Sequence, residues 1–380
     1  MMITCTVVLV TAAVILGFVL KNQVRENPDK NTVNVAIGQW GTTQNESQNY
    51  WNPDNHAVAK GMGGYYFIQT TDGISKIAFF DETTQEAVAV CAKPECTHSD
   101  NTCNAYLCDM KQTGSALYLT DTIYCYNGYL YLIQCEGGMG KLVRIHTDGS
   151  ARETIADLFA NTGVSSISLV FHENDVYAYD DTGHAGQEEE AEEVIKKISL
   201  TDGTEQTVFS YTGTGASIDR GRSFGDKLYF VIREYTKNKE TKAVSSDYKG
   251  LFEYDFATGD TRKVIDADVC DYHADTENQM LFYFVQGTGL YAYDMTQGSN
   301  TLIYPAEDEL IQCKMSYDGK NLYLFNNGAG RATETKHESK DIVMCWIPKG
   351  IRLPKFFATV SFILATQTIC LKKTEIIWNI

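Results

Sequence analysis

A short apolar segment rich in tyrosine recurs along this chain and constrains its fold more than any other feature. Each copy follows a turn, and its side chains alternate between two faces, as in GYLYLIQ, where Tyr129, Tyr131 and Ile133 share one face. Tyrosine and short alternating apolar runs favour β-strands. Six strands of this kind are predicted: GGYYFIQ (63–69), GYLYLIQ (128–134), NDVYAYD (174–180), DKLYFVI (226–232), QMLFYFV (279–285) and KNLYLFN (320–326).

The spacing of these strands indicates a repeated unit. They begin near residues 64, 129, 176, 228, 281 and 322, and each of the first five is followed by a second element with a turn near its middle. A period of about 40 to 50 residues built from short strands is typical of β-propeller blades. One small sheet cannot bury both of its faces alone, whereas blades packed around an axis can. We therefore predict an all-β fold, a β-propeller of six recognisable blades over residues 61–350, with a sandwich or two barrels as the alternative.

The N-terminus carries a long uncharged segment. Residues 3–20 contain no charged side chain. A helix of this length is about long enough to cross a bilayer. A cleaved signal peptide has a basic start and a small-residue cleavage site, and neither is clear here. We predict a transmembrane anchor at 1–21, making a single-pass protein of the cell membrane, and a polar linker at 22–60. Basic residues follow the anchor and none precedes it, so the positive-inside rule alone places the body in the cytoplasm.

The repeat ends before the C-terminus. DIVMCWIPKG (341–350) aligns without gaps onto GLYAYDMTQG (289–298), but residues 351–380 contain no glycine and no aspartate and have a basic bias. A second membrane segment and a packed helix or strands are both open interpretations. The favoured hypothesis is a frameshifted or truncated end that replaces the closing blade. In that case closure of the ring is incomplete.

A cysteine cluster lies between the first two predicted blades, in CAKPECTHSDNTCNAYLC (91–108). Zinc in structural sites prefers four thiolate or imidazole ligands in a tetrahedron. Within thirteen residues the chain supplies Cys91, Cys96, His98 and Cys103, separated by turn-forming residues. These four are the candidate metal ligands, and structural zinc is the candidate cofactor. One or two disulfides, or free thiols, are the alternatives.

The remaining cysteines are predicted to pack in the protein core. Cys125 and Cys135 flank a hairpin whose two-residue Asn127-Gly128 turn places Cys125 opposite Leu130, so the two thiols do not face each other. Both are expected to be buried thiols. The same is expected of the cysteines in later strand-like segments, which are Cys270, Cys313 and Cys345.

Two motifs of this chain resemble motifs of known propeller proteins. SYDGKNLYLF (316–325) resembles the hairpin of TolB-type propeller repeats. The pattern C-x-K-P-x-C-x-H, followed by C-N-A-Y at 103–106, resembles the signature of a family of uncharacterised extracytoplasmic propeller proteins of bacteria, anchored as lipoproteins or by an N-terminal helix. The resemblance spans about 60–345 and implies no activity. It implies a body outside the cytoplasm, although no lipidated cysteine follows the apolar segment; a start codon chosen too late would reconcile this location with the charge pattern.

Charge and motif content narrow the function. A net charge of −17 argues against nucleic-acid binding, which needs a basic surface. The chain has no P-loop, Gly-x-Ser-x-Gly or His-Glu-x-x-His motif. We therefore expect a membrane-tethered extracytoplasmic module that binds a protein or carbohydrate ligand without catalysis. A propeller enzyme acting on polysaccharide, with paired carboxylates at its axial mouth, is one alternative. A metal or redox sensor is the other.

Overall fold

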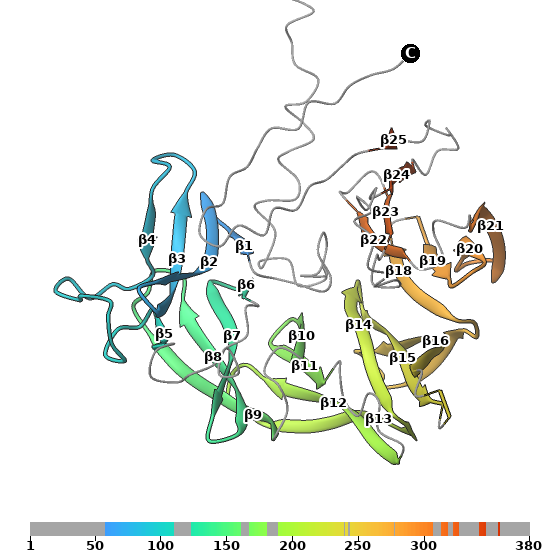
Figure 1. Ribbon diagram of the computed structural model, residues 1–380, viewed down its shortest axis with the longest axis horizontal. Coiled ribbons are helices and arrows are strands. Elements are labelled where there is room, and N and C mark those ends of the chain that lie inside the picture. Colours follow the sequence, from blue (N-terminus) through green and yellow to red (C-terminus); the bar gives the residue numbers. More distant parts are fainter. Residues whose placement is uncertain are drawn as a thin grey trace, which may run out of the picture.

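The computed structural model describes residues 58–109, 123–160, 167–180, 189–238, 240–241, 244–276, 278–306, 313–317, 322–326, 342–346 and 356–357. All regular elements in these ranges are β-strands, and they form six antiparallel sheets that follow one another around an arc (Figure 1). The predicted membrane anchor and most of the predicted linker lie outside the described residues. Among the residues that are described, no helix is long and apolar enough to span a membrane.

Each sheet pairs its strands in chain order. Five sheets have four strands, and the first has a fifth, β5, which pairs with β3. The strands are β1 (Val58–Gly61), β2 (Gly64–Thr71), β3 (Ile74–Asp81), β4 (Ala87–Ala89), β5 (Tyr106–Asp109), β6 (Tyr124–Tyr126), β7 (Tyr129–Glu136), β8 (Met139–His146), β9 (Arg152–Ala160), β10 (Ile167–His172), β11 (Asp175–Asp180), β12 (Glu190–Ser199), β13 (Glu205–Thr214), β14 (Ala216–Phe224), β15 (Lys227–Lys237), β16 (Val244–Asp255), β17 (Thr261–Ile265), β18 (Val269–Asp275), β19 (Met280–Val285), β20 (Gly289–Asp294), β21 (Ser299–Pro305), β22 (Cys313–Tyr317), β23 (Leu322–Asn326), β24 (Ile342–Trp346) and β25 (Phe356–Phe357).

The six predicted strands are confirmed, but each is the second strand of its sheet and not the first. They correspond to β2, β7, β11, β15, β19 and β23. Each sheet therefore starts one strand earlier than the repeat suggested, and β1 begins at Val58, within the segment predicted as linker. At the other end β25 pairs with β24 as the fourth strand of the sixth sheet, so part of the predicted tail belongs to that sheet.

Both faces of a sheet are buried because its neighbours cover them. In β7, Tyr131 and Ile133 pack into a core shared with the third sheet, with Tyr129 packed against it, which confirms the predicted common face. Leu130 and Leu132 point the other way and pack into a core shared with the first sheet. This alternation between two different cores is the packing expected of stacked blades.

The predicted hairpin register around Asn127 and Gly128 is confirmed. Both residues have positive φ, 47° and 79°, as a tight two-residue turn requires, and Cys125 pairs with Leu130. Neither Cys125 nor Cys135 forms a disulfide. Both thiols are half-buried, so the prediction that they are fully buried is wrong. Cys270 is buried, as expected.

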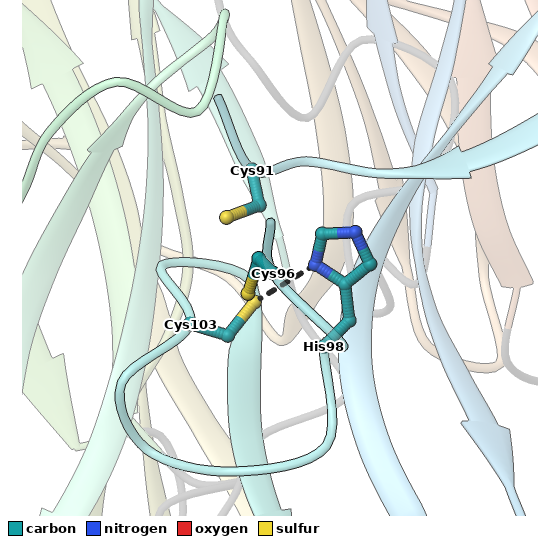
Figure 2. Close-up of side chains that lie close together, drawn as sticks. All are labelled: Cys91, Cys96, His98 and Cys103. Carbon is teal, nitrogen blue, oxygen red and sulfur yellow. Dashed lines mark hydrogen bonds between the residues drawn. The ribbon is translucent and has the colours of Figure 1, made fainter. Parts of the chain in front are cut away.

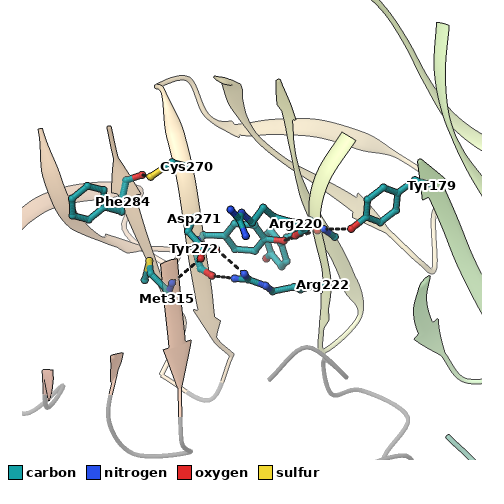
Figure 3. Close-up of polar contacts among 10 residues, drawn as sticks. Tyr179, Arg220, Arg222, Cys270, Asp271, Tyr272, Phe284 and Met315 are labelled. Atoms are coloured by element: carbon teal, nitrogen blue, oxygen red, sulfur yellow. Dashed lines mark hydrogen bonds and ion pairs between the residues drawn. The ribbon is translucent and has the colours of Figure 1, made fainter. Parts of the chain in front are cut away.

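A buried ion pair and one hydrogen bond to its carboxylate join three consecutive sheets through their first strands (Figure 3). The Arg222 Nη2 atom of β14 lies 2.7 Å from Asp271 Oδ1 of β18, and the two side chains are 3% and 0% exposed. The other carboxylate oxygen of Asp271 accepts a hydrogen bond of 2.7 Å from the backbone N–H of Met315 in β22. The Arg222 guanidinium also donates to the carbonyl of Tyr272. One carboxylate therefore links the fourth, fifth and sixth sheets.

The buried imidazole of His273 should make the fold sensitive to acid. Burial, with a smaller effect of the nearby Arg222, lowers its pKa to about 3. An unfolded histidine has a pKa of about 6.5, so between these values the unfolded state binds the extra proton and stability falls as pH falls. This group alone should cost about 2 kcal/mol on going from pH 7 to pH 5.

Urea unfolding at both pH values tests this expectation. The variant His273→Gln should lose less stability between pH 7 and pH 5 than the parent chain, because it has no imidazole to protonate. An equal loss in the two proteins contradicts the assignment.

Candidate metal centre

The four predicted ligands converge in one loop between β4 and β5 (Figure 2). One ligand atom from each of Cys91, Cys96, His98 and Cys103 lies within 4.8 Å of all the others. The fifth cysteine of the segment, Cys108, is buried in β5 and is not part of the group. The structure thus brings together the predicted set of three thiols and one imidazole.

Tight turns fold this loop back on itself. The backbone N–H of Cys96 donates to the carbonyl of Lys93 at 3.2 Å, and that of Cys103 donates to the carbonyl of Asp100 at 3.1 Å. His98 has a φ of +57°, a conformation that residues other than glycine rarely adopt. This backbone places its Nδ1 atom 3.3 Å from Cys103 Sγ.

Burial and backbone hydrogen bonds shift the pKa values of the thiols in opposite directions. Burial raises the pKa of the Cys91 thiol, but hydrogen bonds from the backbone of Lys93 and Asn104 outweigh it, so that this pKa is lowered overall. At Cys103 burial dominates and raises the pKa to about 11, against a backbone hydrogen bond from Ala105. Thiolates are the form that binds metal, and backbone N–H groups directed at sulfur stabilise them.

The loop also docks onto the second sheet, at the turn between β8 and β9. The carbonyl of Gly149 accepts hydrogen bonds from the Ala92 backbone N–H at 3.1 Å and from Asn104 Nδ2 at 2.7 Å. Gly149 has a φ of +74°, and a Cβ atom there would lie 2.5 Å from the backbone nitrogen of Cys91. Only glycine fits this close approach.

Arg152 of β9 holds the second half of the loop. Its guanidinium donates to the carbonyl of Asn104 at 3.1 Å, to the carbonyl of Tyr106 and to Gln134 Oε1 at 2.7 Å. Gln134 in turn donates to the carbonyl of Leu107 at 3.0 Å. The backbone of the C-N-A-Y motif is therefore fixed by side chains of the second sheet, a role that sequence reasoning missed.

Two glycines allow the docking contact to be tested. Gly149→Ala should destabilise the chain by about 1–3 kcal/mol, because the added methyl both strains φ and displaces the cysteine loop. Gly128 has a similar φ of +79° but has no atom within 4 Å of the added Cβ, so Gly128→Ala adds the backbone strain alone. Thermal unfolding of both variants should show the larger loss for Gly149→Ala; equal losses contradict close docking of the loop.

Comparison with known proteins places the fold but not a family. No protein-family model matches the chain, and no curated protein matches it. Its structure is similar to that of a prolyl endopeptidase, with a TM-score of 0.51 and 12% identity, covering 82% of this chain and 43% of that chain. Oligogalacturonate lyase in complex with manganese gives a TM-score of 0.42 and 13% identity over 71% of this chain and 72% of that one. AztD from Citrobacter koseri gives 0.35 and 9%, over 79% and 69%.

The similarity with a TM-score of 0.51 bears on the fold of the chain. The chain has an all-β fold of repeated antiparallel sheets with distant structural similarity to β-propeller proteins. At identities this low the similarity concerns the fold alone.

Proposed function

We propose that the chain is a β-propeller binding module without catalytic activity, in which the loop 91–103 holds a structural zinc ion. The observation that carries the zinc proposal is the convergence of four donor atoms within 4.8 Å. Three thiols and one imidazole are the soft donors that select zinc over magnesium or calcium. Four protein ligands also leave no coordination position open for water or substrate, which is characteristic of a structural zinc and not of a catalytic one.

The position of the loop supports a clamping role for the metal. The loop joins β4 and β5 of the first sheet, and residues at its two ends, Ala92 and Asn104, are hydrogen-bonded to Gly149 and Arg152 of the second sheet. A metal that fixes the loop therefore also fixes the contact between the two sheets. A long loop without secondary structure gains most from such a constraint.

The proposal includes a location at the membrane. The uncharged run 3–20 supports a single-pass anchor, and the resemblance of the cysteine motif supports an extracytoplasmic body that binds a protein or carbohydrate ligand. A fusion of alkaline phosphatase after Gly350, before the C-terminal tail, tests the orientation of the body, because this enzyme folds only where its disulfides form. Activity in intact cells supports the proposal, and an inactive but expressed fusion contradicts it.

Elemental mass spectrometry of the purified full chain, with thiols counted in parallel, tests the metal. We expect about one zinc per chain, lost in Cys96→Ser and kept in the control Cys135→Ser, a half-buried thiol outside the cluster. If no metal is found and two or four thiols are missing from the count, the cluster forms disulfides and does not bind zinc. Absence of metal with every thiol free would favour the redox-sensor alternative.

A further inference from the structure

A second site lies away from the cysteines, between the third and fourth sheets. There the structure has a cavity of about 550 Å³, within the range of roughly 300–1,000 Å³ typical of small-molecule sites. Its lining comes from one strand of the third sheet, two strands of the fourth, and the loop that connects the fourth sheet to the fifth. The lining residues are Tyr211, Tyr248, Lys249, Phe252, Lys263, Asp266, Ala267 and Asp268.

Two aromatic rings form apolar surfaces in this cavity. Phe252 of β16 stacks on Phe230 with ring centroids 5.7 Å apart and an angle of 13°, and Lys263 Nζ lies over its ring at 5.5 Å from the centroid, so this ring is held rigidly. Tyr211 of β13 is fixed by a hydrogen bond of 2.7 Å from its hydroxyl to Glu234 Oε1. Both rings are half-buried, which leaves part of each open to the cavity. Fixed aromatic faces offer contact area at little entropic cost.

Four of the five charged groups at or beside the cavity form two ion pairs. Lys249 Nζ lies 2.8 Å from Glu234 Oε2, and Lys263 Nζ lies 2.8 Å from Asp266 Oδ1. Asp268 accepts a hydrogen bond of 2.9 Å from the backbone N–H of Tyr248. Together with Glu234, these groups comprise two lysines and three carboxylates, so their formal charge is −1. The cavity therefore presents hydrogen-bond donors and acceptors but no positive charge that would attract an anion.

We infer that this cavity binds a neutral oligosaccharide. A sugar ring has apolar C–H faces that pack on aromatic rings, and a rim of hydroxyls that both donate and accept hydrogen bonds. The cavity offers this combination in Tyr211 and Phe252 beside the lysine–carboxylate pairs. An acidic sugar fits less well, because both lysines already face carboxylates and the whole chain carries a net charge of −17. The inference rests on the proposed binding function and names its ligand.

Isothermal titration calorimetry on the full chain tests this inference. The detergent must lack a sugar headgroup, and the probes are cellohexaose, maltohexaose and the hexamer of N-acetylglucosamine, with hexagalacturonate as the anionic counterpart. We expect at least one neutral hexamer to bind and hexagalacturonate to bind more weakly. Tyr211→Ala should weaken binding about tenfold, whereas Tyr211→Phe keeps the ring and should stay within a fewfold of the parent chain.

Two further variants guard against a misfolded protein. Lys263→Met changes an exposed side chain at the rim, which pairs with Asp266 and lies over the Phe252 ring, and should weaken binding severalfold because it removes hydrogen-bond donors. Tyr291→Ala removes a half-buried tyrosine of the fifth sheet, stacked on Tyr283 at 5.3 Å, and should leave binding unchanged. Absence of binding to all three neutral hexamers, or binding indifferent to Tyr211→Ala and Lys263→Met, overturns the inference. Zinc content is measured on the same samples, so either proposal can fail alone.

Discussion

Replacement of Asp271 by alanine should lower the free energy of unfolding by about 3–5 kcal/mol. The carboxylate is completely buried and is shared by the Arg222 guanidinium and the backbone N–H of Met315. Its removal leaves a buried guanidinium without its counter-charge and a backbone donor without its acceptor. The fourth, fifth and sixth sheets meet at this point, so the loss should extend beyond one strand. Urea unfolding of the variant and the parent chain measures it.

Two further variants distinguish the effect of the buried ion pair on stability from that of an exposed ion pair. Glu136→Ala removes a partner of Lys141 that is 75% exposed, and should change stability by less than about 1 kcal/mol. The double variant Arg222→Met with Asp271→Leu removes both charges and should cost less than the sum of the single changes. A loss below about 1 kcal/mol for Asp271→Ala contradicts the proposed role of this carboxylate.

Removal of the proposed zinc is the second change with a large expected effect. An ion that binds only the folded chain stabilises it by about 4 kcal/mol when its free concentration is a thousand times its dissociation constant. Chelation, or Cys103→Ser, should therefore lower the melting temperature and open the loop 91–103. Glu95 is exposed in this loop, so a glutamate-specific protease should cut there faster once the metal is removed.

The cleavage rate also distinguishes a clamp from an incidental ion. Readdition of zinc should restore protection in the parent chain but not in Cys103→Ser. Equal melting temperatures and equal cleavage at Glu95 with and without metal contradict a structural role for the centre.

The apolar strands of this fold could be predicted from sequence, but most of the strands that begin each sheet could not; β6, in the Asn127-Gly128 hairpin, is an exception. The predicted strands alternate because each face packs into a different apolar core, as Leu130 and Tyr131 show. The strand β14 reads ASIDRGRSF and has no such pattern, yet nearly all of it is buried. Its polar residues Asp219 and Arg222 are accommodated by partners on other strands, Arg233 and Asp271, which no local pattern reveals.

The same limit applies to the candidate site. Its four ligands were predictable because they lie within thirteen residues and metal chemistry restricts the residue types. Arg152 and Gly149 were not, because they reach the loop from another sheet. A turn glycine in a hairpin gives no sign that another backbone approaches it. A single arginine 48 residues beyond Asn104 gives no sign of its contact either.

X-ray absorption at the zinc edge of the purified full chain tests the central claim most directly, because it reports the atoms bound to the metal. The proposed set of Cys91, Cys96, His98 and Cys103 predicts three sulfur neighbours at about 2.3 Å and one nitrogen at about 2.0–2.1 Å. In Cys96→Ser, any zinc that remains should have fewer sulfur neighbours. A shell of oxygen and nitrogen alone in the parent chain, or no bound zinc, contradicts the proposed centre.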